Sequence, residues 1–146
     1  MNEDLFHLGI KALIMNNIGQ VLLLKVNPEN LKGYTGEPYW DIPGGRIQFG
    51  SNVEDTLKRE VEEETGITDL KIIKPFSMIL SNIRIPQGKK TVGLILFSYL
   101  CESNQLANIK LSKEHIEYKW FYTTEASVLL KVKYTAEFIE KIADLA

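Results

Sequence analysis

The stretch GGRIQFGSNVEDTLKREVEEETGI, residues 44–67, joins a glycine-rich segment to a run of charged side chains. Within it, residues 52–65 predict a helix, because Gly66 is typical of a helix C-terminus. Two N-terminal caps are compatible with this helix, one from Ser51 and one from Asn52, and both begin it in the same turn. The stretch therefore predicts a glycine-rich turn that leads directly into one helix.

The acidic side chains of this helix are distributed unevenly around its axis. At about 100° per residue the helix has an apolar stripe that should pack on a sheet. The stripe is formed by Val53, Leu57 and Val61. Glu60 and Glu64 fall within the same stripe, and Glu63 lies on its flank. Asp55 and Glu62 fall on the opposite side, where solvent would surround them. Three acids are therefore expected at or near the buried face.

Three acids on a buried face need a balancing positive charge. Burial of an unpaired carboxylate costs several kcal/mol, and neighbouring carboxylates repel one another. Arg59 carries a single charge on another edge of the helix and cannot balance all three. Clustered oxygen ligands suit a hard divalent cation such as Mg²⁺ or Mn²⁺. A solvated acidic helix with ordinary ion pairs is the alternative, but the projection and the preceding glycines favour a metal site.

At this point the stretch resembles the Nudix (MutT-like) box, G-x5-E-x7-R-E-U-x-E-E-x-G-U, in which U is apolar. The matching positions are Gly45, Arg59, Glu60, Val61, Glu63, Glu64, Gly66 and Ile67. The box has an acid where this chain has Ser51. In the family this acid supports the arginine and the neighbouring acids, and it can take part in metal binding. Glu54 or Asp55 would compensate from the next turn; because the other acids are intact, we expect activity, either reduced or with an altered metal preference.

The resemblance implies an α+β fold, the αβα sandwich in which a mixed β-sheet lies between helices, as a single domain over residues 1–146. It also implies Mg²⁺-dependent hydrolysis of a nucleoside diphosphate linked to another moiety: a nucleoside triphosphate, normal or oxidised, or a nucleotide sugar. A divalent metal would neutralise the diphosphate and activate water. The implied metal ligands are Glu60, Glu63, Glu64 and the carbonyl of Gly45. Arg59 would orient the acids.

The family often places a general base outside the box, on a loop before a strand. Glu114 lies in such a loop and is our first choice, because a loop can move a base toward its substrate. Glu117, inside the following strand, is the second choice. Glu60 or Glu63 is a further alternative, because the family is not uniform here. We expect His115 to be a surface residue and not a ligand.

Substrate contacts are expected from residues around the long loop over 27–40. Arg46, beside the metal loop, is placed to contact phosphate, although a solvated arginine is an equal alternative. Tyr34 and Tyr39 can stack on a nucleobase. For Trp40, packing in the core is the better interpretation. These residues do not select one substrate.

Elsewhere the chain alternates between apolar runs and turn-forming residues, which predicts strands, and it ends in helical patterns. The expected elements are a hairpin of strands over 8–15 and 20–26, a short strand over 39–45 that stops at Pro43 and the glycine pair, strands over 70–80 and 91–101 with 82–90 as their turn, a strand over 115–122, and helices over 124–131 and 135–145. This order favours a mixed sheet that is covered by helices on both faces.

The composition limits the partners of the protein. The net charge is -2 over 146 residues, so no nucleic acid polymer or anionic membrane is indicated. The sequence shows no signal peptide and no apolar run long enough to span a bilayer, so we expect a cytoplasmic enzyme. The alternative is a catalytically weak Nudix module that binds a nucleotide, which only Ser51 supports. A homodimer, common in the family, stays open.

Overall fold

The protein has a sheet with helices on both faces. The computed structural model describes residues 2–31, 36–105 and 108–145. Their strands are β1 (Phe6–Met15), β2 (Gln20–Val26), β3 (Trp40–Asp41), β4 (Gly44–Arg46), β5 (Lys71–Leu80), β6 (Ile85–Gln87), β7 (Lys90–Glu102) and β8 (His115–Tyr122). Their helices are the 3₁₀ turn η1 (Pro28–Asn30), α1 (Val53–Thr65), α2 (Thr123–Leu129) and α3 (Ala136–Ala143). No helix within these ranges has the length and apolar character needed to cross a membrane.

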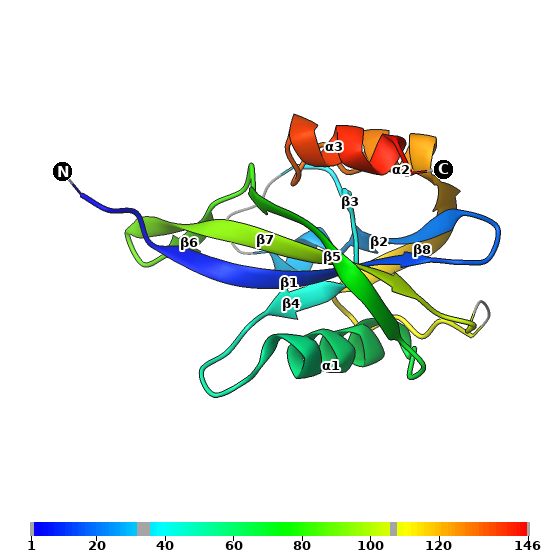
Figure 1. Ribbon diagram of the computed structural model, residues 1–146. Coiled ribbons are helices and arrows are strands. Elements are labelled where there is room, and N and C mark those ends of the chain that lie inside the picture. The colour runs from blue at the N-terminus through cyan, green and yellow to red at the C-terminus, as the bar shows by residue number, and fades with distance from the viewer. Residues whose placement is uncertain (1, 32–35, 106–107, 146) are drawn as a thin grey trace.

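The sheet is mixed. Its strands follow the order β3-β2-β1-β7-β5, while β4 pairs with β1, β6 with β7 and β8 with β2. The long central pair β1 and β7 is parallel, and the other pairs are antiparallel. Helix α1 lies on one side of the sheet, and α2 and α3 lie together on the other (Figure 1). The predicted α+β class, a mixed sheet between helices, is confirmed.

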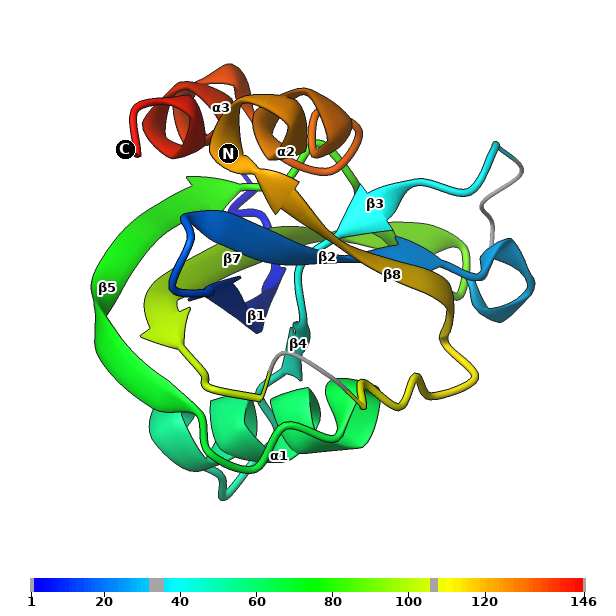
Figure 2. The same ribbon diagram turned by 90° about the vertical axis from the view of Figure 1, so that its right-hand side faces the viewer.

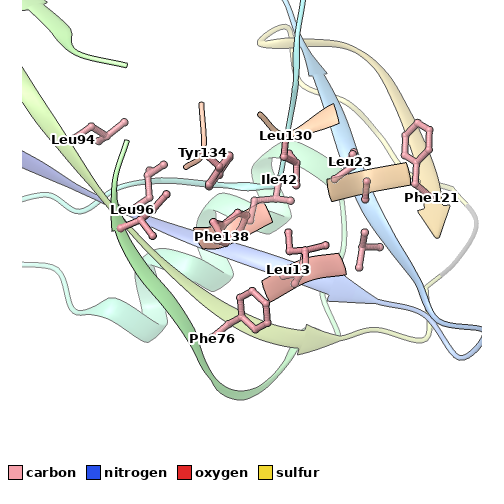
Figure 3. Close-up of a cluster of buried hydrophobic side chains, with 14 residues drawn as sticks. Leu13, Leu23, Ile42, Phe76, Leu94, Leu96, Phe121, Leu130, Tyr134 and Phe138 are labelled. Carbon is pink, nitrogen blue, oxygen red and sulfur yellow. The ribbon is translucent and has the colours of Figure 1, made fainter. Parts of the chain in front are cut away.

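Alternation along the strands builds two hydrophobic clusters, because successive strand residues point to opposite faces. In β2, Val21 and Leu23 belong to the cluster that includes α2 and α3, whereas Leu22 and Leu24 belong to the cluster under α1. Figure 3 shows the first cluster, which Phe138 of α3 joins. Full burial of one such side chain stabilises the fold by about 1.5–3 kcal/mol, so both helix layers are firmly attached.

The short strand expected before Pro43 is present as β3, which ends at Asp41, but the glycine pair that follows starts a further strand, β4. Pro43 has no N–H to donate to a ladder, and the chain changes partner there. Before Pro43, β3 pairs with β2, and after it β4 pairs with β1. The expected turn over 82–90 also contains a short strand, β6, which pairs with the start of β7. The other predicted elements are present, with boundaries that differ by at most a few residues.

Gly44 allows β4 to lie directly against β1. Its φ is 149°, and an added Cβ would stand 2.1 Å from the carbonyl oxygen of Ile10. No other residue type fits so close to a neighbouring backbone. The glycine pair is therefore held between β1 and α1, where its backbone groups can face the acids of the helix.

Candidate functional site

Helix α1 is fixed at both ends and along its buried face. The side chain of Asn52 accepts a hydrogen bond from the N–H of Asp55 at 2.9 Å, so Asn52 and not Ser51 is the N-cap. Gly66 ends the helix with a φ of 79°. Leu57 and Val61 are fully buried against the sheet. The acids of α1 thus sit on a helix that cannot easily rotate.

Glu64 is the most deeply buried acid of α1. It is 4% exposed, and its Oε1 accepts a 2.7 Å hydrogen bond from the N–H of Gly44. Burial raises the pKa of Glu64 to about 8, although Lys11 and the Gly44 N–H act in the opposite direction. A nearby cation would therefore stabilise the ionised form of the Glu64 carboxyl group.

Glu60 lies one turn before Glu64 and packs against Gly45. A Cβ added to Gly45 would stand 2.4 Å from Cδ of Glu60, so only glycine leaves room for this carboxylate. Burial raises the pKa of Glu60, which Arg59 partly opposes through a 3.4 Å ion pair. Arg59 also lies 3.9 Å from Glu63, whose side chain is 60% exposed. Arg59 thus connects a half-buried acid with an exposed one.

A cavity of about 390 Å³ opens beside these acids. Gly45, Glu60 and Glu64 form one part of its wall, and Glu63 is not among its lining residues. Glu114 and His115 face them from the start of β8. Segment 108–114 runs from beside the end of α1 to β8 (Figure 2), and the N–H of Lys110 donates to the carbonyl of Thr65 at 2.8 Å. The fold therefore brings this loop next to the helix.

The two predicted bases lie in different surroundings. Glu114 lines the cavity from the loop before β8 and is exposed to solvent. Glu117 pairs with Lys25 in the sheet, is exposed, and does not line the cavity. A register shift between Lys25 and Val26 separates His115 from Glu117, because His115 pairs with Val26, Ile116 is skipped, and Glu117 pairs with Lys25. Such a bulge redirects side chains, so positions two residues apart no longer share a face.

His115 is not the surface residue that the sequence suggested. Its side chain is 7% exposed and lines the cavity, with Nδ1 at 3.8 Å from Oε2 of Glu64. Burial, reinforced by Lys11, lowers the pKa of His115 to about 4, so the imidazole is neutral. Nδ1 is buried and has no hydrogen-bond partner among the described residues. The bulge that turns His115 inward leaves no signature in the sequence, and we see no signal that would have revealed it.

Three residues of a buried charge network, Lys11, Asp41 and Lys133, line the same cavity. The carboxylate of Asp41 is 3.3 Å from Lys11 Nζ and 2.6 Å from Lys133 Nζ, and it accepts a 2.6 Å hydrogen bond from the Tyr134 hydroxyl. Burial alone would raise the pKa of Asp41, but the two lysines outweigh it and hold the pKa well below its usual range. Sequence reasoning missed this network. The one available signal was Lys11, a charge inside an apolar strand.

A second cavity of about 550 Å³ shares five lining residues with the first. They are Leu31, Tyr39, Arg46, Leu94 and Lys133. Arg46 is exposed and Tyr39 is 6% exposed, so both predicted substrate residues lie on the wall that joins the cavities. Tyr34 lies outside the described residues. Trp40 packs edge-on against Phe121, with 5.1 Å between the ring centroids, as expected for a residue that packs in the core.

Ser51 stands at the first acidic position of the box, and the two acids considered as its substitutes, Glu54 and Asp55, lie in the next turn. Glu54 pairs with Lys58 at 3.1 Å on the exposed side of α1. Asp55 accepts a hydrogen bond from the Asn52 side chain at 2.9 Å and is also exposed. Both acids thus lie on the solvent side of α1, and neither contact involves Arg59, so compensation by Glu54 or Asp55 stays a prediction.

Comparison with known proteins identifies the family of the chain. The family model described as the NUDIX domain matches residues 5–142. The bis(5'-nucleosyl)-tetraphosphatase [asymmetrical] of Mus musculus is 35% identical over 106 residues, which cover 70% of this chain and 69% of that protein. An 8-oxo-dGTP diphosphatase of Haemophilus influenzae is 38% identical over 59 residues, 40% of each chain. The crystal structure of a MutT protein from Methanosarcina mazei Go1 superposes with a TM-score of 0.68 and 29% identity, covering 97% of this chain and 96% of that one.

The match of the family model covers nearly the whole chain, and the structure carries the same architecture as the solved relative. Enzymes of this family generally use divalent metals, and the described residues include an acidic and histidine cluster that faces a cavity. The predicted family is thus confirmed by the family model, by the curated relative and by the fold. The chain belongs to the NUDIX domain family and is a pyrophosphohydrolase of the Nudix hydrolases.

Proposed function

We propose that this enzyme is a Mg²⁺-dependent hydrolase of a nucleoside diphosphate linked to another moiety. One observation carries the proposal: Glu60 and Glu64 of α1 lie against the Gly44–Gly45 turn on the wall of a cavity. Two raised carboxyl pKa values at this wall mark a place where a cation would be favourable. The pairing of acids, glycine backbone and open space suits a metal-assisted cleavage of a diphosphate.

The ligands proposed for the metal are Glu60, Glu64 and the carbonyl of Gly45, with Glu63 at the exposed edge. The donor set fits a divalent cation, because it consists of oxygen atoms and one of the carboxylates is nearly inaccessible to water. A bound cation would neutralise diphosphate oxygens, polarise the bond that breaks and acidify water. Mn²⁺ is the alternative ion. Arg59 would hold Glu60 and Glu63 in place through its ion pairs.

The proposed general base and the proposed substrate contacts come from residues outside α1. Glu114 is proposed as the general base, since it lines the cavity from a loop and is open to water. Glu117 is the weaker choice because it does not line the cavity. Arg46, between the two cavities, is placed to bind phosphate, and Tyr39 on the same wall to contact the second moiety of the substrate.

Among substrates with such a linkage, dinucleoside tetraphosphates rank first. The relative with the longer match is named for that substrate, whereas the 8-oxo-dGTP relative matches over 40% of the chain. A substrate with two bulky ends also suits two cavities that share a wall. Nucleoside triphosphates, normal or oxidised, and nucleotide sugars are the further candidates.

The test is a substrate panel with Mg²⁺, in which products are separated by chromatography. The panel contains a dinucleoside tetraphosphate, dGTP, 8-oxo-dGTP and a nucleotide sugar. We expect turnover of at least one, and a loss of about a thousandfold in kcat/KM for Glu64→Gln, because several kcal/mol of charge stabilisation would be removed. Glu62→Gln, on the exposed side of α1, is the matched control and should keep its activity. Tight binding without turnover of any substrate would overturn the proposal in favour of a binding module.

A further inference from the structure

The buried imidazole of His115 lies opposite the buried carboxylate of Glu64, and its Nδ1 has no hydrogen-bond partner among the described residues. Nδ1 of His115 and Oε2 of Glu64 are 3.8 Å apart, and their side chains are 7% and 6% exposed. This separation is too long for a hydrogen bond, and Nδ1 has no other partner among the described residues. A buried polar nitrogen without a partner is costly, so its position calls for a ligand.

The neighbouring groups do not supply that ligand. Lys11 is buried and its charge affects the pKa of both side chains, but its amino group donates a hydrogen bond to Asp41 at 3.3 Å. A carboxylate oxygen of Glu114 also lies nearby. One ligand atom from each of Glu114, Glu64 and His115 lies within 4.8 Å of the other two. When both acids are ionised and Nδ1 of His115 carries no proton, all three groups are hydrogen-bond acceptors, so none can donate a hydrogen bond to another.

The distance itself fits a shared ion. Ligand atoms about 2.1 Å from a metal are about 3 Å apart when adjacent and about 4.2 Å apart when opposite. The 3.8 Å between Nδ1 and Oε2 lies within this range. An ion at this point would give the nitrogen of His115 a partner and would balance Glu64 from the side away from the Gly44 N–H.

We propose that His115 is a direct metal ligand, and that its Nδ1 and Oε2 of Glu64 bind one divalent transition-metal ion with a Glu114 oxygen in reach. The proposal rests on the role of Glu64 proposed above and adds a nitrogen donor to it. Ser51 stands where the box has an acid, so one carboxylate donor is missing, and His115 supplies a nitrogen donor from across the cavity.

A nitrogen donor changes which ions the site prefers. Carboxylates suit Mg²⁺, Ca²⁺ and Mn²⁺, whereas imidazole suits later divalent ions such as Co²⁺, Ni²⁺ and Zn²⁺. Affinity at a mixed site therefore rises from Mg²⁺ through Mn²⁺ toward those ions more steeply than at an all-oxygen site. His115→Gln should reduce the affinity for Mn²⁺ by about tenfold or more, a range that even the loss of an outer partner of a ligand can reach.

The experiment uses the full chain without an affinity tag, stripped of metal and loaded with Mn²⁺ alone. The chain has two histidines, His7 and His115, which makes the assignment simple. Electron spin-echo envelope modulation should show coupling of Mn²⁺ to ¹⁴N in the wild type and in His7→Gln, and no such coupling in His115→Gln. Circular dichroism checks that both variants are folded.

Isotope labelling tests the same point without a substitution. In protein made with ¹⁵N-histidine and otherwise ¹⁴N, the directly coordinated nitrogen should change to a ¹⁵N pattern. Absence of nitrogen modulation in the wild type, or an unchanged pattern after labelling, would overturn the proposal even if His115→Gln failed to fold. The readout needs no substrate. If the enzyme turns over a substrate of the panel but shows no nitrogen coupling, the proposed function stands and His115 is not a ligand. If nitrogen coupling is seen without turnover, His115 is a ligand and the proposed function fails.

Discussion

At the scale of single residues, one bulge assigns different surroundings to neighbouring side chains. Glu114 and His115 line the cavity, while Glu117 pairs with Lys25 outside it. The sequence offered two acids in the same loop-and-strand segment, and both remained candidates for the base. The skipped residue, Ile116, separates the surroundings of His115 from those of Glu117, while Glu114 precedes β8 and lines the cavity, which ranks it above Glu117.

This ranking predicts unequal effects of two matched substitutions. Glu114→Gln should lower kcat about a hundredfold or more, because general-base catalysis contributes roughly that factor, while Glu117→Gln should leave kcat within about twofold. Rates on the best substrate of the panel, together with Mn²⁺ affinities, measure this. A similar loss in both variants, or a loss only in Glu117→Gln, would contradict the assignment. If Glu114→Gln weakens Mn²⁺ binding as much as it slows turnover, Glu114 acts chiefly as a ligand.

At the scale of elements, the close approach of β4 to α1 positions the acids. The N–H of Gly44 donates to Glu64, and Gly45 leaves the space that Glu60 occupies. The helix was predictable from its pattern and its cap, and so was the presence of glycines before it. That these glycines form a strand was not predictable, because glycine is unfavourable in strands unless another group approaches closely. The approach itself is a tertiary contact.

Gly45→Ala should therefore act through Glu60. The new Cβ would stand 2.4 Å from Cδ of Glu60 and would displace the carboxylate, so we expect Mn²⁺ affinity and kcat/KM to fall about tenfold. A double-mutant cycle with Glu60→Gln measures the coupling by calorimetry and kinetics. In the Glu60→Gln background the alanine should add little. Fully additive losses would show that Gly45 acts by another route.

At the scale of the whole molecule, one buried carboxylate joins three distant parts of the chain. Asp41 of β3 contacts Lys11 of β1, and it contacts Lys133 and Tyr134 in the segment between α2 and α3. The helical layer is thus tied to the sheet beside the cavity. Each of these residues is unremarkable in sequence, and only their meeting makes them a network.

The network predicts a stability that depends on pH. The pKa of Asp41 is depressed in the folded state, so its contribution is present above the unfolded pKa of about 4 and is lost progressively as pH falls below it. Asp41→Asn should lower the free energy of unfolding at pH 7 by about 3–5 kcal/mol, because two lysines lose their partner. Urea unfolding at pH 7 and pH 3 checks whether the difference from wild type shrinks at pH 3. The exposed Asp144→Asn is the control, and a difference that is equal at both pH values would count against the network.

The sequence by itself determined the family, the class of fold and the helix with its inward acids. Those features depend on local patterns: the spacing of Leu57 and Val61, the end at Gly66, and the order of strands and helices. Alternation and helical periodicity act over a few residues, so they can be seen in the sequence.

Only the tertiary structure decided what faces those acids. His115 is turned inward by a bulge, Glu54 and Asp55 lie on the exposed side of α1 with Lys58 and Asn52 as partners, and Lys11 pairs with Asp41. Each outcome depends on pairing between segments far apart in the chain. The physical reason is that burial and electrostatic partners are properties of the assembled core, and a residue type does not reveal which side chain will meet it.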